Sequence, residues 1–326
     1  MRVRIYLILL CGLFLPGLKL IGQDIHFSQF FNSPLGLNPS QTGDFDGNWR
    51  VAANYRDQWT ALNIPYKTMS ASFDEAFPVD NNKFAGGLYV VNDQSALIKN
   101  KIYLSGSWSR ELKGYALSGG LQLGYVMQKV DPHTFPQDYN YQTYNFETVS
   151  PGESSSYFDI NIGFGAKRKI GRYDLEAGAS IYHLNHPTES FSGSGPRLPL
   201  KYLVNLAART DLVTNLYLKP SVLFGYMGGS KDIMLGSWAG YTVQGSRKIR
   251  ELNAGVFVRN GLATNIDAFV LMGGVQIKNI SITASYDMTV STLSKYGKNY
   301  SSFELSLIYR NISAAFKIFS IPCERI

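Results

Sequence analysis

Hydrophobic and polar residues alternate with a period of two along most of the chain after Trp49. In the stretch 157–168 the apolar positions are Phe158, Ile160, Ile162, Phe164 and Ala166, and the positions between them are Asp159, Asn161, Gly163, Gly165 and Lys167. Successive side chains of a β-strand point to opposite faces of a sheet. The alternation therefore predicts strands with one apolar face and one face rich in Gly, Ser, Asn and Gln.

Fourteen segments carry this pattern. Each has about 9–12 residues, the length that a tilted strand needs to cross a bilayer. Their approximate spans are 48–57, 66–77, 83–92, 101–110, 115–128, 157–168, 172–184, 202–210, 216–226, 232–243, 250–258, 268–277, 280–287 and 301–309. Lipid offers no partner to an open sheet edge, so every backbone group must pair within the sheet. We therefore predict an all-β fold, a closed transmembrane antiparallel β-barrel of about 14 strands over residues 48–309.

The connections between these segments differ in length. Gly171-Arg172 and Lys278-Asn279 are typical of tight turns, whereas residues 129–156 and 185–200 form long loops that contain prolines. Short turns at one rim and long loops at the other are typical of bacterial barrels. The tyrosines of the 129–156 loop fit two interpretations equally, a binding surface or a loop folded over the lumen or the rim. Pro220 cannot donate to a ladder and predicts a bulge or a strand end.

Residues 1–22 predict a cleaved signal peptide. Arg2 and Arg4 form a basic start, residues 5–18 are mostly apolar, and Gly22 is a small residue at a plausible cleavage point. No later segment has the roughly 18 consecutive apolar residues of a membrane helix. An exported chain of this kind is either soluble outside the inner membrane or a barrel. Loss of Cys11 with the signal leaves Cys323, so no disulfide within the chain is expected.

The composition favours the barrel over a helical protein and gives no sign of a nucleic-acid partner. Charged residues make up 17% of the chain, against about 25% in ordinary soluble domains. Of the formal charge of +7, three positive charges (Arg2, Arg4 and Lys19) lie in the signal, and their removal leaves +4. Since the sequence has no run of Lys and Arg, we interpret the remaining charges as scattered over the surface and the lumen.

The search for catalytic chemistry predicts no enzyme, no cofactor and no metal site. Of the four His residues, His183 and His186 are close in sequence and fit a polar pair at a strand end. Two His without further close ligands make a poor metal site. The sequence also contains no HExxH motif, nucleophile elbow or phosphate-binding loop.

The N-terminal third carries a family resemblance. It contains the blocks Phe27-Ser28-Gln29-Phe30, Leu37-Asn38-Pro39-Ser40-Gln41-Thr42-Gly43 and Tyr55-Arg56-Asp57-Gln58-Trp59. In order and spacing these blocks resemble the PorP/SprF family of outer-membrane proteins of the Bacteroidetes, and the architectural resemblance covers the whole mature chain. The C-terminal tail, residues 310–326, departs from the family pattern in its last residues, Glu324-Arg325-Ile326.

The resemblance implies an outer-membrane location and a role in the type IX secretion system and gliding motility. Members of the family are implicated in exporting a cell-surface protein, typically a large adhesin with a C-terminal sorting domain, and in holding it at the surface. The implied partners are outer-membrane lipid, this secreted cargo and periplasmic secretion or motor components. The resemblance thus implies a non-catalytic partner or anchor for the cargo.

Residues 23–47 form the segment that carries most of the family motif, and we predict that it forms a plug at the periplasmic mouth of the barrel or lines that mouth. Phe27 and Phe30 offer an apolar surface, and Asn38-Pro39 is typical of a turn. Arg56 and Trp59 are placed to clamp the segment through charge-assisted hydrogen bonds and stacking. The candidate plug or partner-binding residues are Phe27, Ser28, Gln29, Phe30, Asn38, Pro39, Arg56, Gln58 and Trp59. A purely structural role in closing the barrel seam remains an alternative to partner binding.

Three other functions compete with the anchor. A diffusion channel or small-solute transporter fits the Gly- and Ser-rich lumen face, and a lumen blocked by the N-terminal segment would oppose it. A barrel enzyme lacks a recognisable site. A soluble periplasmic β-sandwich is opposed by the length of the strands, since strands in soluble folds usually have about 5–6 residues.

Overall fold

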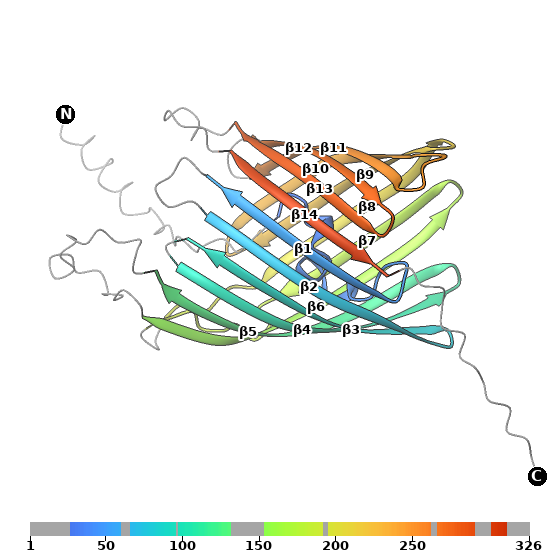
Figure 1. The fold of residues 1–326 in the computed structure, drawn as a ribbon. Coiled ribbons are helices and arrows are strands. Elements are labelled where there is room, and N and C mark those ends of the chain that lie inside the picture. Colours follow the sequence, from blue (N-terminus) through green and yellow to red (C-terminus); the bar gives the residue numbers. More distant parts are fainter. Residues whose placement is uncertain are drawn as a thin grey trace, which may run out of the picture.

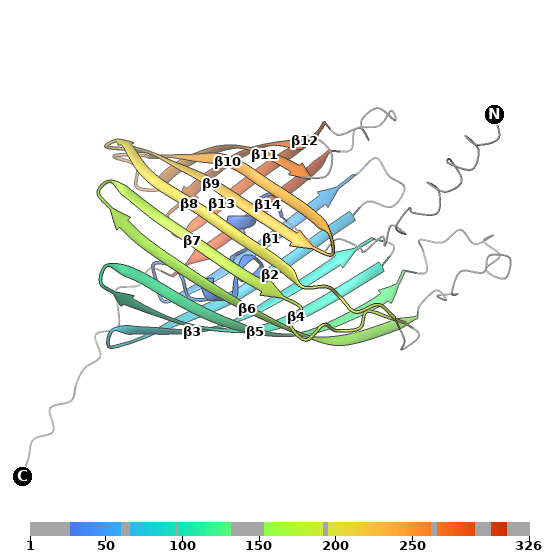
Figure 2. The same ribbon diagram turned by 180° about the vertical axis from the view of Figure 1, so that it is seen from behind.

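The chain forms a closed β-barrel. The computed structural model describes residues 27–59, 66–95, 97–131, 153–191, 195–261, 266–290 and 301–311, and within them fourteen antiparallel strands make one closed sheet (Figure 1, Figure 2). In chain order the strands are β1 (Trp49–Gln58), β2 (Tyr66–Val79), β3 (Asn82–Gln94), β4 (Leu97–Leu112), β5 (Tyr115–Val130), β6 (Ser154–Ile170), β7 (Tyr173–Tyr182), β8 (Lys201–Val213), β9 (Leu216–Met227), β10 (Ser230–Thr242), β11 (Ile249–Gly261), β12 (Ile266–Ile277), β13 (Ile280–Thr289) and β14 (Ser302–Arg310). Consecutive strands are neighbours, and β1 pairs with β14 to close the sheet. The predicted fold class and the predicted number of strands are confirmed.

The two faces of the barrel follow the predicted alternation. On β6, Phe158 and Phe164 are 71% and 59% exposed on the outer face, whereas Asp159 and Asn161 point into the lumen and are buried. The same division between exposed and buried positions runs around the sheet. A band of exposed apolar side chains surrounds a lumen lined by polar and small residues together with two clusters of buried apolar ones. This is the arrangement of a barrel solvated by lipid outside.

The prediction for Pro220 is wrong. The strand β9 continues through Pro220, which lies opposite Ser237 of β10 with no shift of register. The pairing of β8 with β9 is interrupted there instead, between Ala207–Ser221 and Thr210–Leu218. A residue in an antiparallel ladder directs its N–H towards one neighbour, so the missing N–H of proline weakens one ladder and leaves the other intact.

The two rims differ in their connections. The short-turn rim, on the right in Figure 1, carries the β6–β7 turn at Gly171-Arg172 and the β12–β13 turn at Lys278-Asn279, both as predicted. At the opposite rim, the long-loop rim, lie the strand ends that flank the long connections 131–153 and 183–200. Several strands extend further towards the long-loop rim than their hydrophobic pattern predicts, and β4 begins at Leu97 rather than at residue 101. Beyond the lipid band the outer face need not be apolar. Strand pairing therefore continues past the residues that alternate between apolar and polar.

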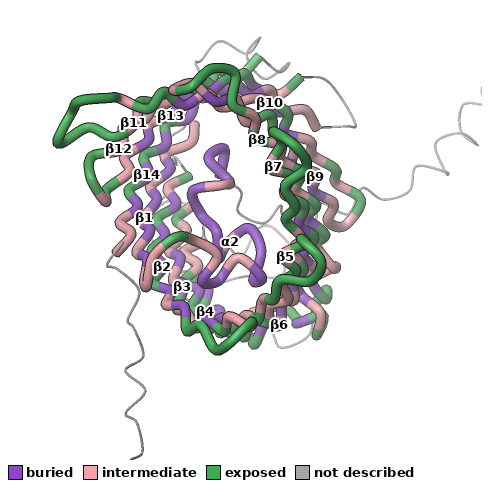
Figure 3. Tube along the Cα trace, turned by 90° about the vertical axis from the view of Figure 1, so that its right-hand side faces the viewer, coloured by how far each residue is buried: buried purple, intermediate pink, exposed green. Residues whose placement is uncertain are grey.

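The residues that precede β1 lie inside the barrel. We call residues 27–48 the lumen segment; it contains η1 (Phe30–Asn32), α2 (Pro34–Leu37) and η2 (Pro39–Gln41). Viewed along the barrel from the short-turn rim, it forms a folded strap within the ring of strands (Figure 3). Residues 1–26 and 312–326, which hold the predicted signal peptide, the start of the motif segment and most of the tail, lie outside the described residues. Where the chain is described, no helix is long and apolar enough to cross a membrane.

Candidate functional site in the barrel lumen

The lumen segment runs between the two ends of the barrel. Ser28 lies beside Arg56, near the end of β1 at the long-loop rim, whereas Gly43 donates its backbone N–H to Asp74 near the end of β2 at the short-turn rim, at 2.7 Å. The predicted location was one mouth of the lumen. The segment instead contacts the wall along most of its height.

A buried charge cluster holds the beginning of the lumen segment. The cluster consists of Arg56, Arg259, Asp287 and Glu304, whose side chains are at most 7% exposed. Arg56 contacts Glu304 at close range and lies 3.2 Å from the carboxylate of Asp287. Arg259 donates to Asp287 at 2.9 Å and to Asp267 at 2.8 Å. The two guanidinium groups and the two carboxylates of the cluster balance each other in charge.

Ser28 is inserted into the middle of this cluster. Its hydroxyl donates to Asp287 Oδ2 at 2.6 Å and accepts from Arg56 at 2.8 Å and from Arg259 at 2.9 Å. Its backbone N–H donates to Glu304 Oε1 at 2.6 Å, and the N–H of Gln29 donates to Glu304 Oε2 at 2.9 Å. Loss of one partner of a buried ion pair typically costs about 3–5 kcal/mol, because an unpaired charge stays behind. The cluster therefore fixes the segment through contacts that are costly to break.

One face of the lumen segment is apolar and packs against β7–β12. Phe30 and Leu37 belong to a cluster of buried residues that also contains Tyr182, Leu203, Leu223, Met234, Phe257, Val270 and Met272. Phe30 meets Phe257 edge to face with ring centroids 6.2 Å apart, and Phe31 lies 5.3 Å from the ring of Trp238. Each fully buried side chain of this size contributes about 1.5–3 kcal/mol through the hydrophobic effect. These lumen positions are apolar because the segment covers them.

The barrel wall also holds the backbone of α2. Leu35 is fully buried in a second apolar cluster with Tyr89, Val91, Tyr103, Val126, Tyr157 and Leu198. Gln122 donates to the carbonyl of Leu35 at 3.1 Å, and Tyr182 donates to the carbonyl of Gly36 at 3.0 Å. A helix of four residues leaves most of its carbonyls without hydrogen-bond partners inside the helix. Side chains of the wall donate to two of these carbonyls.

The predicted turn at Asn38-Pro39 is present and fits closely against the wall. Asn38 accepts the N–H of Ser40 at 2.9 Å, which caps η2, and its amide donates to the carbonyl of Phe164 at 3.0 Å. The backbone of Pro39 lies so near Gly120 that a Cβ at that glycine would collide with the Pro39 carbonyl. Glycine in the wall thus makes room for the turn.

The lumen segment joins β1 through a second ion pair. Arg50 donates to both carboxylate oxygens of Asp74, at 3.0 and 2.6 Å, and to the carbonyl of Gln41 at 3.0 Å. The Arg50 guanidinium also lies 4.6 Å from the centre of the Phe45 ring. This pair fixes the exit of the segment at the short-turn rim.

The structure brings together most of the candidate residues, but not all. Phe27, Ser28, Gln29, Phe30, Asn38, Pro39 and Arg56 are all buried in the lumen. Gln58 accepts from the Nε of Arg56 at 3.2 Å, so it contacts the cluster indirectly. Trp59 packs edge-on against Tyr66 at 5.3 Å, at the long-loop end of β1. Sequence reasoning missed Arg259, Asp287 and Glu304 as partners of the segment, although the inward position of Glu304 was visible in the alternation of β14.

The two His residues predicted as a polar pair make separate contacts. His183 is buried with Nδ1 2.9 Å from Asp159 Oδ1, whereas His186 Nδ1 lies 3.2 Å from the carbonyl oxygen of Leu198. Both residues have positive φ, 63° and 45°, so the chain turns sharply and sends the two rings to different surroundings. Among the described residues, no group of three or more His, Cys, Asp and Glu could hold a metal ion.

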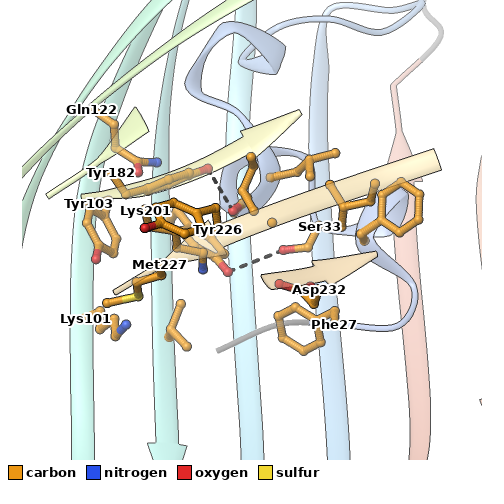
Figure 4. A pocket seen from close by; sticks show the side chains of 18 of the residues that line it. Phe27, Ser33, Lys101, Tyr103, Gln122, Tyr182, Lys201, Tyr226, Met227 and Asp232 are labelled. Atoms are coloured by element: carbon orange, nitrogen blue, oxygen red, sulfur yellow. Dashed lines mark hydrogen bonds between the residues drawn. The ribbon is translucent and has the colours of Figure 1, made fainter. Parts of the chain in front are cut away.

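A pocket of about 120 Å³ lies on the long-loop side of the lumen segment (Figure 4). Phe27, Phe30 and Leu37 form its floor, and strands β3–β5 and β7–β10 form its walls. The walls are largely aromatic and aliphatic, with polar groups among them: Tyr89, Val91, Lys101, Tyr103, Gln122, Tyr182, Lys201, Leu203, Leu223, Tyr226, Met227, Ser230 and Asp232. The geometry therefore offers space for a small apolar group above a floor that the segment itself provides.

Solved outer-membrane proteins share this fold at low sequence identity. The toluene transporter TbuX of Ralstonia pickettii is 9% identical with a TM-score of 0.53, over 86% of this chain and 94% of that one. The monoaromatic hydrocarbon channel CymD is 10% identical with a TM-score of 0.54, over 90% of this chain and 96% of that one. A FadL homologue of Pseudomonas aeruginosa is 13% identical with a TM-score of 0.50, over 85% and 93% of the two chains. Identities this low establish the fold alone.

A family model identifies the chain more closely than these structures do. No curated protein matches the chain. Residues 20–309 match the model described as type IX secretion system membrane protein PorP/SprF, which spans the lumen segment and nearly the whole barrel. The barrel fold and this match agree on an outer-membrane location. The chain belongs to the PorP/SprF family of type IX secretion system membrane proteins.

Proposed function

We propose that this barrel is a non-catalytic outer-membrane component that helps to secrete a cell-surface protein through the type IX system and to hold it at the surface. The family supports the secretion context. The observation that carries the proposal is the lumen segment, which is fixed to the wall by the buried charge cluster around Ser28. A barrel whose lumen is filled in this way offers its rims, rather than a pore, to other molecules.

The contacts of the lumen segment argue against an open pore. Glu304 of β14 holds the segment at one side, and Ser180 of β7 donates to the carbonyl of Leu37 at 3.0 Å from the opposite side. Since the segment is bound to both walls, solutes would have to pass around it. We infer that the seven buried candidate residues serve first to plug the lumen, because a partner could reach them only after the segment had moved.

The two rims would then meet different partners. Long loops of bacterial barrels face the cell exterior and short turns face the periplasm. We infer that the secreted protein, an adhesin-type cargo, binds at the long-loop rim. Periplasmic secretion or motor components would dock at the short-turn rim.

The test is an affinity purification of the tagged barrel from solubilised outer membranes, followed by mass spectrometry. We expect a large surface protein and type IX components to co-purify, and we expect the same surface protein to leave the cell surface when the barrel gene is deleted. An untagged strain and a tagged unrelated barrel serve as controls. Recovery of the barrel alone, with an unchanged cell surface in the deletion strain, would contradict the proposal.

A channel for small apolar solutes is the second candidate, and the pocket favours it. Its volume of about 120 Å³ approaches that of the roughly 150 Å³ cavity that accommodates benzene in another protein. Two proteins with the same fold are described as a toluene transporter and a monoaromatic hydrocarbon channel. The pocket would be one binding site along the route that a solute takes past the lumen segment.

A pair of adjacent substitutions tests the channel. Leu203 lines the pocket, whereas Val204 is 41% exposed on the outer face. If the barrel is a channel, toluene uptake by cells should fall in Leu203→Phe and stay unchanged in Val204→Phe. Absence of barrel-dependent uptake, together with absence of conductance in planar bilayers, would eliminate this candidate.

A further inference from the structure

The short-turn rim carries a ring of exposed cations. They come from the turns and strand ends of four hairpins: Arg110, Lys113, Arg168, Arg172, Arg247, Lys248, Arg250 and Lys278. Exposed Lys169 and Arg209 lie there too, each beside an acidic residue. Asp46, Asp80 and Glu111 are further exposed acids at this rim, and Glu75 is half-buried nearby, so the exposed cations still outnumber the acids. The rim is therefore strongly positive.

Two of these cations lie along the outer face of the barrel. The guanidinium of Arg168 lies 4.1 Å from the ring centre of Tyr115, its partner across the β5–β6 ladder, and bonds to the Tyr115 hydroxyl. Arg172 lies 5.1 Å from the ring centre of Tyr173 and donates to its hydroxyl at 3.0 Å. Both tyrosines belong to the exposed outer band. Aromatic rings of barrels gather at the membrane interface, so these cations lie at headgroup depth.

The cations also form two groups along the rim. Arg110 lies opposite Leu117 on β5, two residues along that strand from Tyr115, which faces Arg168. Farther round, the N–H of Lys278 donates to the carbonyl of Lys248 at 2.9 Å, which ties the β10–β11 and β12–β13 turns together. Adjacent turns thus present several positive charges to one short stretch of membrane.

We propose that the short-turn rim is a binding surface for the headgroups of anionic phospholipids. Two observations favour this partner. The rim is positively charged, and its cations lie at the edge of the apolar band that faces lipid. Clusters of Lys and Arg at a membrane surface attract anionic lipid with about fivefold preference per cation. The contact would fix the depth and tilt of the barrel.

The test compares two double variants with equal change in charge. Arg168→Gln with Arg172→Gln alters the short-turn rim, and Lys129→Gln with Lys231→Gln removes two exposed cations from the long-loop rim. Each barrel is reconstituted with equal amounts of phosphatidylethanolamine and phosphatidylglycerol and re-extracted in mild detergent, and the retained lipid is measured by mass spectrometry. We expect phosphatidylglycerol to be enriched on the unmodified barrel. The enrichment should fall by roughly 25-fold in the first variant, about fivefold for each of the two cations removed, and remain in the second.

Heat-modifiable migration on gels confirms that each variant is folded before its lipid is measured. High salt should reduce the enrichment on the unmodified barrel, because the attraction between headgroup and cation is screened. Equal enrichment in both variants would overturn the proposal. So would capture of an acidic periplasmic protein that depends on Arg168 and Arg172 while lipid retention does not.

Discussion

Glu304 connects the lumen segment with the seam where the barrel closes. Its carboxylate accepts the backbone N–H groups of Ser28 and Gln29 and faces the Arg56 guanidinium. We expect Glu304→Gln to loosen this end of the segment, because a neutral amide accepts these bonds more weakly and leaves Arg56 with less negative charge beside it. Hydrogen bonds to charged groups contribute about 1.5–3 kcal/mol. Hydrogen exchange at the Ser28 and Gln29 amides should therefore accelerate by about tenfold to a hundredfold.

A neighbour on the same strand supplies the control for Glu304. Ser306 also points into the lumen and is buried, but it donates to Asn54 at 2.6 Å and so serves the wall. Ser306→Ala should leave exchange at the two amides unchanged. An equal acceleration in both variants would mean that any change in β14 loosens the segment, and the special role of Glu304 would be lost.

The sequence identifies single residues of this site but not their partners. Ser28 and Arg56 stand out because they belong to short motif blocks near the start of the chain. Their partners come from the last strands, and Arg56 and Glu304 are 248 residues apart. A local pattern shows that Glu304 faces inward, but the contact arises from closure of β1 on β14 and from a segment folded back into the lumen.

At the scale of the element, the lumen segment depends on glycine in the wall of β5. A side chain at Gly120 would strike the carbonyl of Pro39 and the N–H of Ser40. We expect Gly120→Val to push η2 from the wall, at a typical cost of about 1–3 kcal/mol for overpacking. The fraction of barrels with a displaced segment should rise by about fivefold to 150-fold. Planar bilayers would record this as more frequent conductance events.

The adjacent glycine provides a matched control. Gly119 has nothing within 4 Å of the position of a Cβ. Gly119→Val should therefore behave like the unmodified barrel. Conductance that rises equally in both variants would reflect a disturbed β5, and conductance that rises in neither would mean that the segment does not limit flow through the lumen.

The strands and the lumen segment differ in how far sequence can predict them. A strand such as β6 is visible because lipid on one side and a polar lumen on the other force alternation on successive residues. The lumen segment has no such periodicity, and its three short helices depend on Pro34, Asn38 and Pro39 together with bonds from the wall. Its apolar partners Phe257 and Val270 look like ordinary inward positions until the segment covers them.

For the whole molecule, closure follows from the sequence because an even set of long amphipathic strands has no other way to satisfy its backbone in lipid. The filling of the lumen does not follow in the same way. Alternation fixes which side chains face inward, but it leaves open whether water, a loop or a terminal segment meets them. Only the motif blocks near the start of the chain predicted that a terminal segment would meet the inward side chains.

The proposed cargo rim and the proposed phospholipid surface both depend on the orientation of the barrel in the membrane, which can be measured. Glu111 is exposed at the short-turn rim, and Lys231 is exposed at the long-loop rim. In a Cys323→Ser background we expect a membrane-impermeant maleimide to label Lys231→Cys on intact cells, and to label Glu111→Cys after the outer membrane is permeabilised, because short turns face the periplasm. The charge cluster around Ser28 would then lie in the outward half of the lumen, with the exit at Arg50 on the periplasmic side. Labelling of Glu111→Cys on intact cells would reverse the barrel, place the cation ring in the outer leaflet and contradict both the proposed cargo rim and the phospholipid surface.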